Sequence, residues 1–401
     1  MPALILKQGR EKSLLRRHPW IFSGAIHHMD EEPASGSTVD LLSFNKQFLA
    51  RASYSPQSQI RARVWTFEDE TIDKEFFRKR IRSAIAVRFA ISPSPLTPLP
   101  QGVGNALRLI YAESDGLPGL IVDRYGDVLV LQSLTAGSEY WKETIADLLL
   151  EETGLNTIYE RSDADVRELE GLEQKVGILR GADPQLPITI SEHNLKFNIN
   201  IAAGHKTGFY LDQRKNRLRV RELSKDKDVL DCFCYTGGFT VNALAGGAKS
   251  VVSVDSSADA LVLAKENIAL NDPSADKSTF IEGDVFQLLR KFRDENRSFD
   301  MIILDPPKFA PTAAQAERAA RGYKDINLLA FKLLRPGGIL VTFSCSGGID
   351  AGLFQKIIAG AALDASVEAQ IVEHLSQGAD HPVSLHFPEG AYLKGLVCLR
   401  K

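Results

Sequence analysis

Apolar and polar side chains alternate along three stretches near the N-terminus, residues 38–43, 47–54 and 59–67. A period of two is typical of strands that bury one face, so residues 1–72 are expected to form a small β-rich domain. In the third stretch this period puts Arg61 and Arg63 on the face opposite Ala62 and Val64. The two arginines, with a basic helix expected over residues 10–17, predict a surface that binds a phosphate backbone.

A second pattern begins at residue 73, where apolar side chains recur at helical spacing through residue 91. Four prolines and two glycines in residues 92–104 then predict an exposed loop. Three short strand patterns, an amphipathic helix over 138–152 and one further strand follow. Residues 73–187 are therefore expected to form a small α/β middle domain, with no obvious catalytic grouping.

From residue 188 a hairpin pattern leads into a helix near 212–223, and strand and helix patterns then alternate to the end of the chain. The expected strands are 228–232, 250–255, 278–282, 299–304 and 338–344. Such alternation predicts an α/β fold with a doubly wound parallel sheet over residues 188–401, and such sheets bind ligands at the carboxyl ends of their strands.

Three of these strand ends suit a nucleoside-containing cofactor. Asp231 is followed by a turn containing Gly237 and Gly238, which lets the backbone approach a ligand. Asp255 can accept hydrogen bonds from both ribose hydroxyls, and Asp284 lies at the right height to bind an adenine edge. Since G-x-G-x-x-G is absent after the first strand, S-adenosylmethionine fits better than a dinucleotide.

The last two strand ends bear on the reaction. Asp305 precedes two prolines that form a rigid corner, from which its carboxylate can bond to a nucleobase. Cys345 places a thiol in a polar turn at a strand end, whereas Cys398 lies within an apolar strand pattern and is expected to be a packing residue. Cys232 and Cys234 are likewise expected to pack.

Composition narrows the class of protein. The chain has 401 residues, 25% charged residues and a mean hydropathy of -0.12. No stretch is apolar for long enough to span a membrane, and the four cysteines lack metal-ligand spacing, so a cytoplasmic protein without membrane or metal is expected. The first 100 residues contain 15 Lys and Arg against 10 Asp and Glu, although the net charge of the chain is -3. This local excess of positive charge favours an RNA partner.

Long ordered blocks resemble the RNA cytosine-5 methyltransferases of the class I S-adenosylmethionine-dependent fold, and more narrowly the bacterial group that acts on large-subunit rRNA. The blocks are GREKSLLRRHPWIFSGAI, SQIRARVWTF, AESDGLPGLIVDRYGD, GHKTGFYLDQR, CFCYTGGF, DPPKF, RGYKDINLLA, SCSG, DHPV and EGAYLKG. The resemblance implies an N-terminal PUA domain, a small middle domain and a methyltransferase domain. It also implies 23S rRNA or its precursor as partner, and leaves a homodimer open.

The resemblance assigns roles to residues of this chain. Cys345 would be the nucleophile that adds to C6 of cytosine, and Asp305 would stabilise charge on the ring. The cofactor is expected to lie against Phe233, Tyr235, Thr236, Gly237, Gly238, Asp255, Ser256, Asp284, Asp305 and Gln213. The expected RNA-binding residues are Lys7, Arg10, Lys12, Arg16, Arg17, Arg61, Arg63, Lys206, Arg214 and Lys308.

Alternatives stay open at this point. A purine N-methyltransferase can carry a similar acid-proline corner without a covalent nucleophile, in which case Cys345 is structural. A cytosine-5 methyltransferase acting on tRNA or DNA, or a non-catalytic ribosome-assembly factor, would also bind nucleic acid. No cysteine neighbours Asp305, so the base that removes the C5 proton has no assignment.

Overall fold

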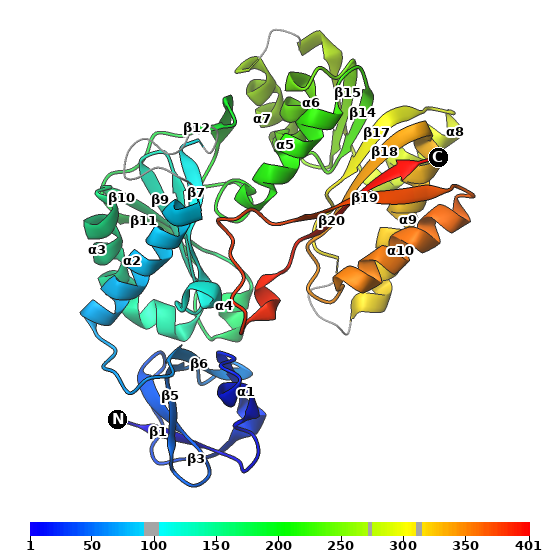
Figure 1. Cartoon of the computed structure of the whole chain (residues 1–401). Helices are drawn as coiled ribbons and strands as arrows, with labels where there is room; N and C mark the ends of the chain where they lie inside the picture. The colour runs from blue at the N-terminus through cyan, green and yellow to red at the C-terminus, as the bar shows by residue number, and fades with distance from the viewer. Residues whose placement is uncertain (92–103, 272–274, 310–314) are drawn as a thin grey trace. The chain divides into compact units, whose positions relative to one another are not determined.

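A computed structural model describes residues 1–91, 104–271, 275–309 and 315–401 (Figure 1). The predicted loop at 92–104 falls outside the described residues, except for Gly104. The chain separates into two compact units, which are described in turn. The first contains Met1–Ile190, Ile199–Leu211 and Ala379–Gly390; the second contains Ser191–Asn198, Asp212–Gly378 and Ala391–Lys401.

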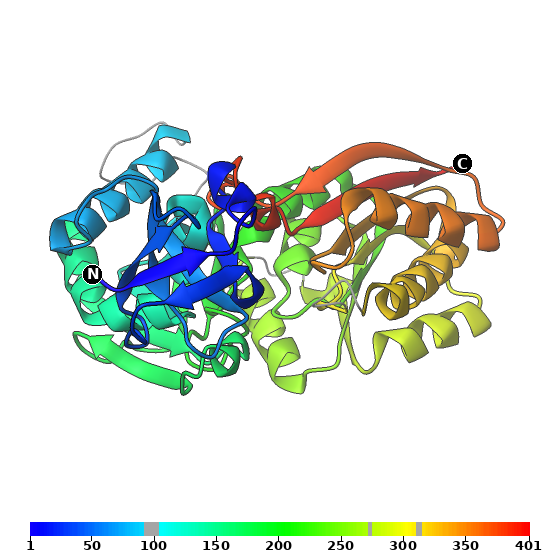
Figure 2. The same cartoon turned by 90° about the horizontal axis from the view of Figure 1, so that it is seen from below.

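A six-stranded sheet forms the N-terminal part of the first unit (Figure 2, blue). Its order is β2-β6-β5-β4-β1-β3. The bounds are β1 Ala3–Leu6, β2 Trp20–Phe22, β3 Ile26–Met29, β4 Thr38–Leu42, β5 Phe48–Tyr54 and β6 Ile60–Thr66. The three predicted strands are confirmed as β4, β5 and β6, whereas β1, β2 and β3 are too short to show a period. The expected basic helix is a single turn, α1 Lys12–Leu15.

The rest of the first unit packs helices onto a five-stranded sheet of order β11-β10-β9-β8-β7. Its strands are β7 Ala106–Tyr111, β8 Leu120–Tyr125, β9 Val128–Ser133, β10 Thr157–Ser162 and β11 Lys175–Arg180. The helices are α2 Lys74–Ile91, α3 Ala136–Thr153 and the short α4 Val166–Leu169. The predicted helix at 73–91 and the predicted helix at 138–152 are confirmed as α2 and α3. Their apolar faces share one core, which includes Phe77, Leu131 and Ile145.

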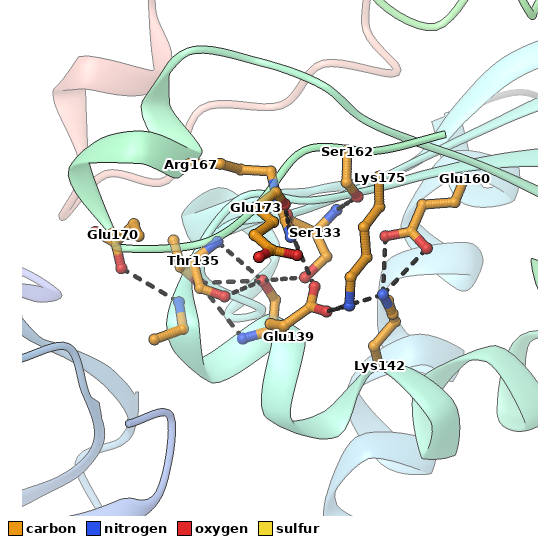
Figure 3. A network of polar contacts seen from close by, with 12 residues as sticks. Ser133, Thr135, Glu139, Lys142, Glu160, Ser162, Arg167, Glu170, Glu173 and Lys175 are labelled. Atoms are coloured by element: carbon orange, nitrogen blue, oxygen red, sulfur yellow. Dashed lines mark hydrogen bonds and ion pairs between the residues drawn. The ribbon is translucent and has the colours of Figure 1, made fainter. Parts of the chain in front are cut away.

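Charged side chains form a polar network between α3 and the sheet (Figure 3). Glu139 pairs with Lys142 at 2.9 Å, Lys175 at 2.7 Å and Arg167 at 3.0 Å. Lys142 also pairs with Glu160 at 2.9 Å. Burial alone would raise the pKa of Glu139, but its bonds to the three cations outweigh burial and lower the pKa to about 2. The network ties the helix to strands far along the chain.

We predict that Glu139→Gln destabilises the protein by about 3 kcal/mol at pH 7, because Arg167 and Lys142 stay buried after losing an anionic partner. Glu143→Gln on the same helix is the matched control: Glu143 pairs with Arg180 at 2.7 Å but is 67% exposed, so its loss costs less than about 1 kcal/mol. Urea denaturation of the full chain measures both differences.

The pH dependence of this difference is a second test of the network. A depressed carboxyl pKa contributes stability above its unfolded value, and that contribution disappears as the pH falls through the folded value. The advantage of the wild type over Glu139→Gln should therefore shrink between about pH 4.5 and pH 2. Equal losses for Glu139→Gln and Glu143→Gln would contradict the account.

The second unit is built on a seven-stranded sheet of order β16-β15-β14-β17-β18-β20-β19. The strands are β14 Asp228–Cys232, β15 Ser250–Asp255, β16 Ser278–Glu282, β17 Phe299–Leu304, β18 Leu334–Ser344, β19 Ala369–Ser376 and β20 Lys394–Arg400. The strands β16, β15, β14, β17 and β18 run parallel to one another. β20 pairs antiparallel with β18, and β19 pairs antiparallel with β20 at the edge of the sheet. This confirms the predicted doubly wound sheet; the antiparallel edge was not predicted.

Helices cover both faces of this sheet (Figure 1). α5 Arg214–Leu223, α6 Gly238–Ala245 and α7 Ala258–Ala269 form one layer; α8 Val285–Asp294, α9 Ala316–Leu333 and α10 Ala351–Asp364 form the other. The predicted hairpin is β12 Ile188–Glu192 with β13 Leu195–Ile199. Within the described residues, every helix is too short or too polar to cross a bilayer.

Candidate functional site

The sheet order of the second unit gathers the candidate residues at one edge. β14 lies between β15, which follows it in the chain, and β17, so the strand order reverses at β14. Ligands of open α/β sheets bind at such a reversal, beyond the carboxyl ends of the strands. Asp255, Asp305 and Cys345 each end or directly follow one of these parallel strands. The structure therefore places these three predicted residues along the carboxyl-terminal edge of the same sheet.

The turn between β14 and α6 is conformationally strained. Phe233 and Tyr235 have φ values of 63° and 48°, in the left-handed region that side chains disfavour by roughly 1 kcal/mol each. Gly237 has φ 78°, and a Cβ there would lie 3.1 Å from the Cβ of Ala264. The Tyr235 amide donates to Asp255 at 2.8 Å, which helps to hold the turn. Strained backbone of this kind is common at ligand-binding and active sites.

Two of the carboxylates predicted to bind the cofactor, Asp255 and Asp284, lie at or just after the ends of β15 and β16. Besides Tyr235, Asp255 accepts from the Ser257 amide at 2.9 Å, and Ser256 beside it is exposed. Asp284 is exposed and caps α8 by accepting from the Gln287 amide at 2.9 Å. Both carboxylates are thus oriented by backbone donors of their own loops.

Asp231 precedes the glycine turn, and the sequence predicts no further role for it. In the structure it is fully buried in β14. Thr240 donates to its Oδ2 at 2.7 Å, whereas its Oδ1 has no hydrogen-bond partner among the described residues. Burial is the main reason that its pKa is raised to about 7, and the charges of Asp305 and Asp255 raise it further. The only sequence signal for a role was its place one residue before the strand end.

This edge of the sheet fits a cationic ligand with polar groups. The Thr236 hydroxyl in the same turn is also buried and lacks a partner among the described residues. Three carboxyl groups, Asp231, Asp255 and Asp305, interact electrostatically here. A positively charged sulfonium cofactor with an adenosyl group matches both the negative charge and the unpaired polar atoms.

Cys345 differs from the other cysteines of the chain. It is partly exposed, whereas Cys232, Cys234 and Cys398 are at most 5% exposed. Burial raises the pKa of each of these three thiols, that of Cys398 to about 12. They therefore remain protonated at neutral pH, whereas Cys345 is partly exposed after the end of β18. The packing roles predicted for Cys232 and Cys398 agree with their place in the core.

The RNA-binding residues predicted within residues 1–72 fall into two groups that differ in exposure. Lys7, Arg10, Lys12, Arg16 and Arg17 are exposed. Arg61 donates to the Pro56 carbonyl. Arg63 is only 4% exposed and pairs with Glu170 at 2.8 Å. The period of two correctly separates Arg63 from the core that contains Ala62 and Val64, but acidic side chains cover the face of Arg63, so it has no free surface to offer RNA.

The remaining candidates come from two segments. Lys206 is exposed and stacks over the Tyr210 ring at 4.5 Å, and Lys308 is exposed after the proline corner. Gln213 is buried and accepts from Asn216 at 2.6 Å. Arg214 is 8% exposed and pairs with Glu192 at 3.4 Å. Gln213 and Arg214 are therefore held in place by neighbours in the second unit.

Comparisons agree with this architecture. Residues 4–67 match a PUA-like domain family, and residues 177–388 match an S-adenosylmethionine-dependent methyltransferase family. A candidate S-adenosylmethionine-dependent methyltransferase from Streptococcus mutans is 21% identical, with full coverage of both chains and a TM-score of 0.84. A methyltransferase crystal structure complexed with SAH covers both chains fully with a TM-score of 0.85. The chain thus has the fold of an S-adenosylmethionine-dependent methyltransferase and matches that family.

Two curated relatives are similar over nearly the whole chain. The ribosomal RNA large subunit methyltransferase I of Shewanella amazonensis is 52% identical, with 98% of each chain covered. The protein of the same name from Vibrio cholerae is 51% identical, with 99% of each covered. The chain belongs to the ribosomal RNA large subunit methyltransferase I family, which confirms the resemblance seen in the sequence blocks.

Asp231→Asn tests the account of the buried carboxyl. An acid whose pKa is raised on folding destabilises the fold above its unfolded pKa, and the full cost is reached above the folded value of about 7. The variant without ligand should therefore be more stable than wild type at pH 8, by about 4 kcal/mol, and equal to it below about pH 4. Thermal denaturation across this range measures the difference.

The same variant should bind S-adenosylmethionine at least about tenfold more weakly in titration calorimetry, since it removes one of the three interacting carboxyl groups at these strand ends. Thr342→Val is the control, because Thr342 is equally buried but belongs to β18, which is separated from β14 by β17. An Asp231→Asn protein that is less stable at pH 8, or that keeps full cofactor affinity, would contradict the assignment.

Proposed function

We propose that this protein methylates C5 of a specific cytosine in 23S rRNA of the large ribosomal subunit, with S-adenosylmethionine as methyl donor. The relatives of the same family carry large-subunit rRNA methyltransferase in their names. The observation that carries the choice of base is Cys345, a partly exposed thiol at the end of β18, beside the corner that holds Asp305. We place the reaction in the cytoplasm, where this RNA is found.

We assign the cofactor to the strand ends around β14. Its holding residues are Phe233, Tyr235, Thr236, Gly237, Gly238, Asp255, Ser256, Asp284, Asp305 and Gln213. When bound, S-adenosylmethionine supplies a methyl group activated by a positively charged sulfur. Asp255 orients ribose hydroxyls, and the glycine turn lets backbone amides approach the ligand. Asp231 contributes negative charge and an oxygen that has no hydrogen-bond partner among the described residues.

The chemistry of the acceptor explains the thiol. C5 of cytosine is a weak nucleophile, so addition of the Cys345 thiolate to C6 gives C5 the enamine character that it needs to accept a methyl group. Asp305, bonded to N3 and the exocyclic amine, stabilises the charge that develops on the ring. Loss of the C5 proton then breaks the bond between sulfur and C6 and restores the aromatic ring. The target base must leave its stack to reach this edge of the sheet.

The strongest alternative is methylation of a purine nitrogen. A ring or exocyclic nitrogen already carries a lone pair, so an acid-proline corner suffices and Cys345 would only pack. A non-catalytic assembly factor would bind rRNA but transfer no methyl group. Identification of the modified nucleoside separates all three.

We predict that the wild-type protein converts cytidine to 5-methylcytidine in 23S rRNA from a strain that lacks the enzyme. Cys345→Ala should lower turnover at least about a thousandfold while cofactor affinity changes less than about twofold, because the thiol acts on the base. Cys398→Ala is the matched control and should keep turnover. Mass spectrometry of nucleosides and titration calorimetry are the measurements.

Substrate RNA containing 5-fluorocytidine gives a direct test of the covalent step. Fluorine at C5 prevents the loss of a proton, so a protein–RNA adduct should accumulate on wild type and be absent from Cys345→Ala. A methylated purine, or full activity of Cys345→Ala, would overturn the covalent mechanism.

The RNA-binding surface gives a further prediction. Arg10, Lys12 and Arg16 are exposed on the N-terminal module, and their combined replacement by glutamine should weaken rRNA binding. The slope of log affinity against log salt concentration should fall by about 2, because each lost phosphate contact releases fewer counterions. Glutamine at the exposed Lys291, Lys332 and Lys356 removes equal charge and serves as control. Equal effects of the two triple variants would contradict this surface.

A further inference from the structure

The turn that carries Cys345 is contacted by residues from two of the sequence blocks, RGYKDINLLA and EGAYLKG. The first contains Tyr323 of α9 and the second contains Lys394, the first residue of β20. Neither has a role in the mechanism described so far. Their contacts with the segment around Cys345 show what they hold in place.

Ser346 joins the two catalytic segments. It is completely buried, and its hydroxyl accepts from the Phe309 amide at 3.1 Å and contacts the Tyr323 hydroxyl at 2.9 Å. Phe309 ends the proline corner that begins at Asp305. The turn that carries Cys345 is therefore fastened to the corner that carries Asp305.

Lys394 holds the same turn from the other side. In the antiparallel pair of β18 and β20 it lies opposite Ser344, the residue before Cys345. Its Nζ donates to the Ser346 carbonyl at 2.8 Å and to the Tyr392 carbonyl at 2.7 Å. Within the described residues it forms no ion pair with a carboxylate. A half-buried ammonium held only by carbonyl oxygens lacks a full counter-charge.

The charges around this ammonium come from three elements. Burial lowers the pKa of Lys394 to about 8, Cys345 and Asp350 act to raise it, and Lys308 acts to lower it. Tyr323 from α9 also faces Cys345 and interacts with it electrostatically. Electrostatic coupling is reciprocal, so a thiolate that favours the protonated lysine is favoured by it to the same extent.

We propose that Lys394 is a positioning residue: its two carbonyl contacts hold the Cys345 turn against the Asp305 corner, and its positive charge stabilises the Cys345 thiolate. This inference rests on the proposed role of Cys345 as nucleophile. It assigns the EGAYLKG block a function in preparing the thiolate before RNA binds.

The test is the alkylation of Cys345 by iodoacetamide as a function of pH, followed by mass spectrometry of its peptide in the full-length protein. The other three cysteines are at most 5% exposed and report on unfolding. Lys394→Gln should move the midpoint of alkylation up by about one pH unit and slow it about fivefold to tenfold at pH 7. Lys394→Arg keeps the charge and should restore most of the rate.

Lys324→Gln is the matched control, because Lys324 adjoins Tyr323 but pairs with Asp364 at 2.7 Å on the surface. Its alkylation profile should coincide with that of wild type. In Lys394→Gln, the midpoint of the acid limb of the kcat pH profile should move to higher pH, by the same amount as the midpoint of alkylation. A purely structural role for Lys394 would lower the rate without moving either midpoint.

A second measurement needs no lysine variant and covers the case in which Lys394→Gln fails to fold. In protein with 13C-labelled lysine, the Lys394 Cε signal titrates with its ammonium, and Cys345→Ser should lower that pKa because the thiolate is removed. An unchanged Lys394 titration, or an unchanged alkylation profile in folded Lys394→Gln, overturns the inference. Full activity of Cys345→Ala would instead overturn the covalent mechanism and leave the alkylation result standing.

Discussion

The reversal of strand order at β14 is the constraint on which the site depends. Because β15 and β17 lie on opposite sides of β14, the loops that follow these strands diverge and leave room for a ligand between them. The strands that fix this order bury large apolar side chains at their centres: Leu230, Ile302 and Leu340 are 0% exposed. Packing in the sheet therefore sets the positions of Asp255, Asp305 and Cys345, although none of these three residues belongs to that packing.

This arrangement costs stability. Two non-glycine residues adopt left-handed backbone conformations in one turn. A buried carboxyl group beside two other carboxylates has one oxygen without a hydrogen-bond partner among the described residues. The apolar core shared by the sheet, α8, α9 and α10 offsets this cost. Such conflicts between local preference and fold are typical of functional sites, because a bound ligand can supply the missing donors and positive charge.

The sequence predicted what depends on local patterns. The parallel strands follow from apolar runs, and the strand-end acids Asp255 and Asp305 follow from those strands. The contacts of Lys394 and Tyr323 with the Cys345 turn could not be predicted, since they join residues 23 and 48 positions from Ser346 through pairing that no local pattern encodes. Arg63 shows the same limit: its strand face was predictable, but the acidic side chains that cover that face come from residues 113 and 170.

The support given to the Cys345 turn bears on the choice between a carbon and a nitrogen acceptor. A nitrogen acceptor needs no thiol, and a packing cysteine would be best served by an apolar pocket, as Cys398 is. Cys345 instead lies in a turn held by a buried serine hydroxyl, a buried tyrosine and a half-buried ammonium that lacks a carboxylate partner in the described structure. Each of these groups is hydrogen-bonded within the turn or to the adjoining segments, so together they hold the turn in one conformation. A thiol that must ionise and attack carbon needs a fixed position and a nearby positive charge. The contacts of this turn therefore support the proposed cytosine-5 reaction over its nitrogen alternative.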